Sequence, residues 1–379
     1  MTRRVALIAL ALVVAACSGP VLANPPAQRP AASPPPDASP PAADDPQPIS
    51  LPRDDAPHDR LTEWWYYTGH LHSVDGRRFG FEYVVFRAER GSFPVAWASH
   101  FAITDETGKR FLYAQRSEVG PQVDRGALQE SNGFDFALVA PEAAAGAAWT
   151  MQGSDGIDHL AAATSGGEAR PSGGSIALRL DLRSTKPAAL HDRDGWIDFG
   201  PAGGSYYYSR TRMAASGEVR VDAETFDVDG EAWFDHQWGD FIAVGGGGWD
   251  WFAVNLDDGT DLTLSLVRDR DGSYPLVYGT EVANDGSSRH LERDAFNVDV
   301  TGHRTSPTTG TVYPASWRVT IPSESLVIDL RPTVSDQELD TRPTSGVVYW
   351  EGSQVVSAKR AGRSIGGQAY VELTGYGPG

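Results

Sequence analysis

The chain of 379 residues has a single cysteine, little basic charge and few long apolar runs. The lone Cys17 excludes an intrachain disulfide. The 32 basic residues stand against 50 acidic ones, a net charge of −18. A nucleic-acid partner is therefore not expected, because phosphate binding needs a basic surface. Beyond the N-terminus no segment is apolar enough to form a transmembrane helix.

Several catalytic signatures are also missing. The chain contains no Gly-x-Ser-x-Gly elbow, no His-Glu-x-x-His, no P-loop and no Gly-x-Gly-x-x-Gly after a strand. If Cys17 carries a lipid, a cysteine nucleophile is excluded as well.

The N-terminus has the pattern of an export signal. Arg3 and Arg4 precede an apolar run over residues 5–14, which is too short to span a bilayer comfortably. Val14-Ala15-Ala16-Cys17 then resembles a bacterial lipobox. We predict a signal peptide at 1–16 and a lipid on Cys17, which would anchor the protein in the cell envelope, on the periplasmic side of the outer membrane. The alternative is an ordinary secretory signal, which also exports the protein.

A proline-rich tether is expected to follow the lipid. Residues 20–57 hold 13 of the 26 prolines and show no apolar periodicity, so they cannot bury a core. We assign residues 17–57 to this lipid-anchored linker.

The remainder of the chain predicts an all-β protein. Aromatic and β-branched runs alternate with turn signals such as Asp-Gly. The expected strands include 64–71, 79–87, 95–104, 176–183, 226–234, 249–256, 261–268, 316–321, 326–330 and 368–374. Four glycines, Gly245 to Gly248, predict a boundary between domains at 58–244 and 245–379. The Ala/Gly-rich stretch 141–174 predicts a surface loop or a short helix.

A first aromatic cluster is Glu63-Trp64-Trp65-Tyr66-Tyr67-Thr68-Gly69-His70-Leu71-His72. In a strand, Trp64, Tyr66 and His70 share one face, while Glu63 and Trp65 share the other. Such a strand could form a pocket wall, or its aromatics could be core. The His-x-His pair is a weak metal signal unless His100 or His236 adds a third ligand.

A second cluster runs from Gly230 to Asp240 and contains Asp235-His236-Gln237-Trp238. Imidazole exchanges protons near neutral pH, and a nearby carboxylate can orient it. Asp235 and His236 nevertheless point to opposite faces of a regular strand and would meet only at a turn or bulge. The alternative is a structural polar network.

A third cluster places Glu351 and Glu372 on two C-terminal strands, each beside an aromatic residue. These carboxylates could line a cavity, but the commoner situation is an exposed strand end.

Together these clusters resemble the carotenoid 1,2-hydratase (hydroxyneurosporene synthase) and AttH-like family, often labelled predicted secreted hydrolases. The matching stretches, in order, are EWWYYTGHL, GFEYVVFR, GEAWFDHQWGDF, YWEG and GQAYVELTGY. They extend from Glu63 to Tyr376, nearly the whole predicted folded part.

The resemblance implies two tandem lipocalin-like β-barrels and an apolar ligand. For the named enzymes it implies cofactor-free addition of water to an isoprenoid double bond, without a metal. The family's Asp-His-x-Trp motif falls on Asp235, His236 and Trp238, and its aromatic motif falls on Trp64, Trp65 and Tyr66. The hydratases also use a Tyr and an Asp on a following strand, where DLTLSLVR offers only Asp261.

Two functions remain open from the sequence. The first is an envelope hydratase or hydrolase in which Asp235 and His236 are the acid–base pair. Its substrate-binding residues would be Trp64, Trp65, Tyr66, Trp238 and Trp251. Of these, Trp64, Trp65 and Trp238 would shape the pocket and stabilise a cation. The second is a carrier of a hydrophobic ligand, in which the same residues are only pocket wall. A metal hydrolase using His70, His72 and His236 is a third, more distant alternative.

Overall fold

The computed structural model describes residues 46–129, 132–139, 148–241 and 246–377. Within these ranges the chain forms 23 β-strands and five short 3-10 turns, and no α-helix. The 3-10 turns are η1 (Arg53–Asp55), η2 (Pro121–Val123), η3 (Gly126–Gln129), η4 (Gly200–Ala202) and η5 (Pro322–Glu324). The all-β prediction is therefore confirmed.

The first antiparallel sheet has twelve strands in the order β4-β3-β2-β1-β12-β11-β8-β7-β6-β5, with β9 and β10 also paired to β11. Its two edge strands, β4 and β5, approach each other, as a hydrogen bond between them shows: Arg116 of β4 donates to the carbonyl of Leu138 in β5 (3.2 Å). The sheet thus forms a barrel. Its strands are β1 (Thr62–Ser73), β2 (Arg78–Ala88), β3 (Ala96–Asp105), β4 (Arg110–Val119), β5 (Phe134–Leu138), β6 (Trp149–Ser154), β7 (Ile157–Ala163), β8 (Ile176–Ser184), β9 (Ala189–Leu190), β10 (Trp196–Asp198), β11 (Gly204–Val221) and β12 (Glu224–Gly239).

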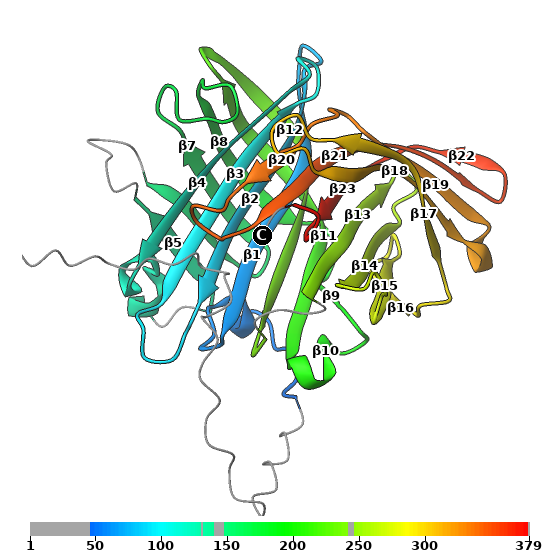
Figure 1. Ribbon diagram of the computed structural model, residues 1–379, viewed down its shortest axis with the longest axis horizontal. Helices are drawn as coiled ribbons and strands as arrows, with labels where there is room; N and C mark the ends of the chain where they lie inside the picture. The colour runs from blue at the N-terminus through cyan, green and yellow to red at the C-terminus, as the bar shows by residue number, and fades with distance from the viewer. Residues whose placement is uncertain (1–45, 130–131, 140–147, 242–245, 378–379) are drawn as a thin grey trace, which may run out of the picture.

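The second antiparallel sheet has eleven strands in the order β16-β15-β14-β13-β23-β21-β19-β18-β17, with β20 and β22 also paired to β21. It curves away from the first sheet (Figure 1). Its strands are β13 (Gly246–Leu256), β14 (Asp261–Asp269), β15 (Leu276–Val282), β16 (Ser288–Leu291), β17 (Asn297–Thr305), β18 (Val312–Ile321), β19 (Leu326–Pro332), β20 (Glu338–Asp340), β21 (Val348–Arg360), β22 (Arg363–Ile365) and β23 (Gly367–Leu373).

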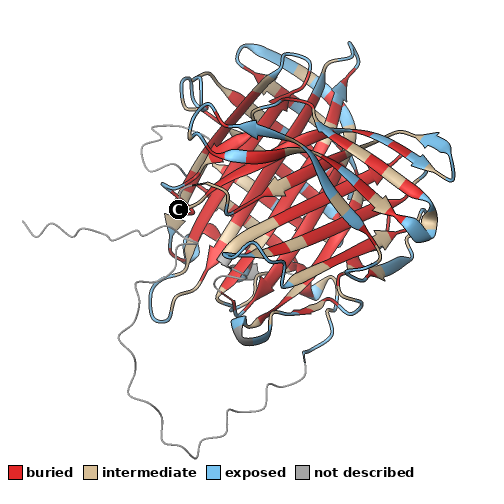
Figure 2. Ribbon diagram, turned by 45° about the vertical axis from the view of Figure 1, so that its right-hand side comes forward, coloured by how far each residue is buried: buried red, intermediate tan, exposed pale blue. Residues whose placement is uncertain are grey.

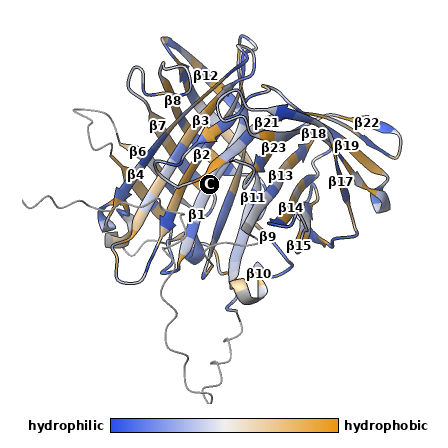
Figure 3. Ribbon diagram, in the orientation of Figure 1, coloured by the Kyte–Doolittle hydropathy of each residue, from blue (hydrophilic) through white to orange (hydrophobic). Residues whose placement is uncertain are grey.

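Each sheet encloses a core of its own. Alternation along the strands sends Trp65, Tyr83 and Trp149 into the first core, and Phe252 and Trp317 into the second. Figure 2 shows the buried residues along the strands and the exposed ones mainly at the turns, and Figure 3 shows polar and apolar residues alternating. Two lipocalin-like units, as predicted, result from this packing.

The two sheets also pack against each other through their outer faces. A separate apolar cluster joins Tyr66 and Trp233 of the first sheet to Trp251 and Tyr370 of the second. At Gly80 in β2, a Cβ atom would lie only 2.4 Å from the Tyr370 hydroxyl, so glycine allows the close approach. The strands β1, β2 and β11 lie beside β13, β21 and β23 at this junction (Figure 1).

The predicted domain boundary at 244/245 falls within residues 242–245, which lie outside the described residues. Along the sequence, the last strand of the first sheet ends before this stretch, at Gly239, and the first strand of the second sheet begins after it, at Gly246. The signal peptide, Cys17 and most of the predicted linker also lie outside them. The end of the predicted linker belongs to the folded part, however. Ile49 and Leu51 pack on the first core, and Asp55 is fully buried.

The stretch 141–174 departs from the expected loop or short helix. Its described part contains β6 and β7, which pair with each other and with neighbours in the first sheet. Small residues such as those in β7 carry little strand preference of their own, and tertiary pairing decides their conformation.

Candidate active site

A cavity of about 300 Å³ lies between the two sheets, at the junction of their outer faces. Its size falls at the lower end of small-molecule sites. Its wall is mostly apolar and aromatic, and it includes three acidic side chains: Glu82, Asp235 and Glu372. The aromatic residues are Trp64, Tyr66, Phe86, Phe199, Tyr207, Phe241, Trp249, Trp251, Tyr278 and Tyr349.

Strand alternation decides which predicted residues reach this cavity. In β1, Trp64 and Tyr66 line it, whereas Trp65 points into the first core. In β12, Asp235 lines it, whereas His236 and Trp238 lie on the inner face. Trp251 of β13 completes the wall from the second sheet.

The pairing of β12 with β1 and β11 is regular at this point, so Asp235 and His236 stay on opposite faces. The structure therefore brings Asp235, Trp64, Tyr66 and Trp251 together. It places His236, Trp65 and Trp238 elsewhere.

Asp235 is buried and surrounded by side-chain donors. It accepts hydrogen bonds from the Tyr207 hydroxyl (2.6 Å), the Trp233 indole N–H (2.6 Å) and the Ser209 hydroxyl. Trp251 in turn donates to the Tyr207 hydroxyl (3.0 Å), which links the two sheets. Burial raises the pKa of Asp235 to about 7, while the three donors act to lower it.

Glu82 of β2 is the acidic residue that sequence reasoning missed. One oxygen, Oε1, accepts a hydrogen bond from the Tyr349 hydroxyl (2.6 Å). The other, Oε2, is buried and has no hydrogen-bond partner among the described residues. Burial raises the pKa of Glu82 to about 8, with a further contribution from the charge on Glu372 and an opposing one from Tyr349. The raised pKa favours the neutral carboxylic acid form of Glu82 at pH 7.

His100 also lines the cavity and contacts the Tyr349 hydroxyl that donates to Glu82. Its Nδ1 lies 2.8 Å from the Tyr349 hydroxyl, and its Nε2 lies 3.2 Å from the Thr344 hydroxyl. Burial lowers the pKa of His100 to about 3, so the imidazole is neutral and adds no positive charge that would ionise Glu82.

Of the two C-terminal glutamates, Glu351 is buried and Glu372 is half-buried, both at the same junction. Glu372 accepts from the Trp249 indole N–H (3.0 Å), and burial raises its pKa to about 7. Glu351 accepts from the Tyr66 hydroxyl (2.8 Å), and burial together with Glu82 and Glu372 holds its pKa well above the usual range. Neither is an exposed strand end.

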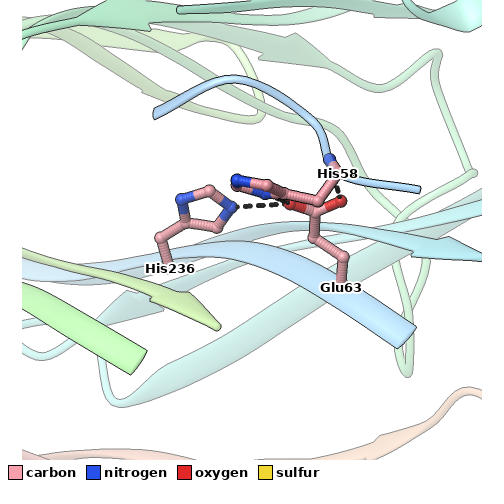
Figure 4. A group of neighbouring side chains, drawn as sticks. All are labelled: His58, Glu63 and His236. Atoms are coloured by element: carbon pink, nitrogen blue, oxygen red, sulfur yellow. Dashed lines mark hydrogen bonds and ion pairs between the residues drawn. The ribbon is translucent and has the colours of Figure 1, made fainter. Parts of the chain in front are cut away.

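His236 belongs to a different cluster, on the inner face of the first sheet. Its Nε2 lies 2.9 Å from Glu63 Oε1, and His58 Nδ1 lies 2.7 Å from the same oxygen (Figure 4). Burial lowers the pKa of His236, and Glu63 acts in the opposite direction. Ligand atoms of these three residues all lie within 4.8 Å of one another, a spacing that could hold a metal ion.

The three histidines of the distant metal-hydrolase alternative, His70, His72 and His236, do not come together. His70 lies on the outer face, with its Nε2 3.1 Å from the Ala369 carbonyl, while His236 lies on the inner face. His72 is exposed. His100 is held at Tyr349 and Thr344 and does not join them.

Asp261, the only acidic residue of DLTLSLVR, has a structural position. It is fully buried and pairs with Lys186 (2.7 Å) and Arg212 (2.7 Å), both from the first sheet's half of the chain. The β14 residues that reach the cavity are Ser265 and Val267.

The fold and cavity define a class of two-barrel proteins. A candidate AttH from Nitrosomonas europaea has a TM-score of 0.74 at 28% identity, covering 88% of this chain and 98% of that one. Kievitone hydratase from Nectria haematococca has the same fold, with a TM-score of 0.65 at 14% identity, covering 86% and 93%. The profile of the AttH-like family matches residues 42–376, so the chain belongs to this family, as the resemblance predicts.

Among curated proteins, none matches the chain significantly. In the part of the chain that the structure describes, no helix has the length and apolar character needed to cross a membrane.

Proposed function

We propose that the protein is a cofactor-free hydratase that adds water to a carbon–carbon double bond of an apolar ligand held between the two sheets. One observation carries the proposal: a buried carboxyl group, Glu82, lines an aromatic cavity with one oxygen unpartnered among the described residues, and burial raises its pKa. An acid that stays protonated at neutral pH is what protonation of an alkene needs.

The acid step begins at Glu82 Oε2. Its O–H bond breaks as the π electrons of the alkene form a new C–H bond, which leaves a carbocation on the neighbouring carbon. Trp64 and Trp251 line the cavity, and an indole ring attracts a cation through its quadrupole. The mostly apolar wall lowers the local dielectric constant, which strengthens this attraction.

Water then adds to the cation. Its oxygen forms the C–O bond, and its extra proton passes to Asp235, whose three donors stabilise the carboxylate. Return of that proton to Glu82 through water restores the enzyme, so the net change is the addition of one water molecule. Asp235 keeps a catalytic role in this scheme, whereas His236 does not touch the cavity.

The carrier alternative uses the same cavity without turnover. The aromatic wall and the volume of about 300 Å³ suit a small apolar ligand in either case. A hydrolase would also use a carboxyl pair, but an aromatic wall suits a cationic transition state better than acyl transfer, which needs hydrogen-bond donors for an oxyanion.

We further propose that the protein acts in the bacterial cell envelope, anchored by a lipid on Cys17 at the periplasmic side of the outer membrane. The lipobox-like Val14-Ala15-Ala16-Cys17 and the proline-rich stretch that follows support this placement. An apolar substrate dissolved in the membrane would then lie close to the cavity.

The test compares three proteins on lipid extracts of the native host. Wild type should convert one or more extracted alkenes to hydrated products, followed by mass spectrometry. Glu82→Gln, which keeps the side-chain shape, should lower turnover by about 10²–10⁴-fold. Glu118→Gln, a partly exposed residue of β4 away from the cavity, should behave as wild type. Ligand retention without turnover in all three would support the carrier.

A further inference from the structure

The cluster of His58, Glu63 and His236 lies outside the proposed reaction and on the opposite face of the first sheet. His58 comes from the segment before β1, Glu63 from β1 and His236 from β12 (Figure 4). Two imidazoles and a carboxylate converge there, and their ligand atoms lie within 4.8 Å of one another. We propose that these three residues bind a divalent transition metal ion of the zinc type.

The donor set fits such an ion. Two histidine nitrogens and one carboxylate oxygen form a common three-ligand set, with a fourth position left for water. The present separations of 2.7 and 2.9 Å from the nitrogens to Glu63 Oε1 are hydrogen-bond distances. Around a tetrahedral ion with bonds of about 2.0–2.1 Å, ligand atoms stand roughly 3.3 Å apart, so small side-chain rotations suffice.

The arrangement of hydrogen-bond donors and acceptors around His236 favours a cation between His236 and Glu63. The Tyr208 hydroxyl donates a hydrogen bond to Asp55, which also accepts hydrogen bonds from Arg210 Nη2 (2.8 and 3.0 Å). The Tyr208 oxygen therefore offers a lone pair to His236 Nδ1 at 3.3 Å. When Nδ1 carries the proton of a neutral imidazole, Nε2 presents a lone pair to the Glu63 carboxylate. A metal ion between these two atoms removes that conflict.

The outer contacts resemble those of metal-binding histidines. A ligating histidine usually donates its second ring N–H to a carboxylate, a backbone carbonyl or water, which fixes the ring. His236 has the Tyr208 hydroxyl in this place, and His58 Nε2 lies 3.6 Å from Asp54 Oδ1. The His58 ring is also stacked on Trp238, with centroids 4.1 Å apart and an interplanar angle of 1°.

An ion can reach this site from solvent, and once bound it would connect separate segments of the fold. The His58 side chain is 22% exposed, whereas those of Glu63 and His236 are fully buried, so an ion would enter beside His58. Once bound, it would tie the segment before β1 to both β1 and β12. Binding to the folded state alone would stabilise the protein by mass action.

The experiment uses the full chain, purified without a histidine tag and freed of metal with a chelator. Co²⁺ is titrated while the visible absorption of four-coordinate Co²⁺ is followed, and Zn²⁺ is then added in competition. We expect one Co²⁺ per chain, displaced by Zn²⁺, and a rise in Tm with Zn²⁺. His58→Ala should weaken binding by at least about 100-fold, the upper range for loss of an outer partner alone.

His70→Ala is the matched control, because His70 also faces a glutamate, Glu106, at 3.4 Å but lies outside the cluster. It should leave Co²⁺ binding unchanged. Absence of stoichiometric binding by wild type would overturn the proposal and leave a proton as the shared cation. Equal affinity in wild type and folded His58→Ala would overturn it as well, and would point to a surface site. Neither result bears on Glu82 or the cavity.

Discussion

Replacing Glu82 with glutamine should change how stability depends on pH. The pKa of Glu82 is raised by burial from 4.5 to about 8. A carboxyl whose pKa is raised on folding binds its proton more tightly in the folded state. Its contribution is therefore complete below pH 4.5 and is lost as pH rises towards 8. Glutamine has the same shape but does not titrate.

The magnitude follows from linkage. Each pH unit between the two pKa values removes about 1.4 kcal/mol of stability, so between pH 5 and 7.5 wild type loses roughly 3 kcal/mol through Glu82. Glu82→Gln does not lose this stability as pH rises, because glutamine does not titrate. It leaves an amide N–H in place of the unpartnered Oε2, at a cost of about 1–3 kcal/mol that does not change with pH.

Urea unfolding of both proteins at a series of pH values measures the difference. The free energy of unfolding of Glu82→Gln, relative to wild type, should rise by roughly 3 kcal/mol from pH 5 to pH 7.5. Because the comparison is a difference, the other buried carboxyls largely cancel. A relative stability that is constant with pH, or falls, would show that Glu82 is already ionised in the folded protein and would remove it as the acid.

Three further predictions concern the anchor, the acid and the inner cluster. Cys17→Ala should release the protein from the membrane fraction, and a wild type that is already soluble and unmodified would contradict the lipid anchor. Tyr349→Phe removes a hydrogen bond that lowers the pKa of Glu82, so the alkaline limb of the activity profile should move to higher pH. An unchanged limb would separate Tyr349 from catalysis. His236→Ala breaks a buried pair with Glu63 and should cost about 3–5 kcal/mol of stability, with turnover of the folded protein close to wild type. A fall of about 10²–10⁴-fold in that turnover would restore His236 as an acid–base residue.

Much of the fold follows from strand periodicity. The run that became β8 alternates strictly, and those that became β1 and β2 are rich in aromatic and β-branched residues; all three were predicted within two residues of their observed ends. The predicted strand 226–234 lies inside β12, which continues to Gly239. The same alternation correctly separates Trp64 and Tyr66 from Trp65. Strands β6 and β7 escaped notice because their Ala/Gly-rich surroundings show no such contrast, and only pairing within the barrel makes them strands.

The site was harder to predict, because it forms where two sheets meet. Asp235 stands out through its motif, and period-two alternation already puts His236 on the other face. Glu82 sits in an apolar run that reads as an ordinary buried strand. Its place opposite Thr68, on the face shared with Trp64 and Tyr66, depends on the register of β1 with β2. Its approach to Tyr349 depends on the packing of the second sheet.

The most direct test of the account is incorporation of labelled water. Purified protein is incubated with host lipid extract in H₂¹⁸O, and the extract is searched for compounds that gain the mass of one labelled water molecule. Wild type should produce such a compound, fastest between about pH 7 and pH 8, where Glu82 is protonated and Asp235 is ionised, and Glu82→Gln should produce almost none. Retention of an apolar ligand with no labelled product in wild type, or equal labelling in both proteins, would contradict hydration by Glu82.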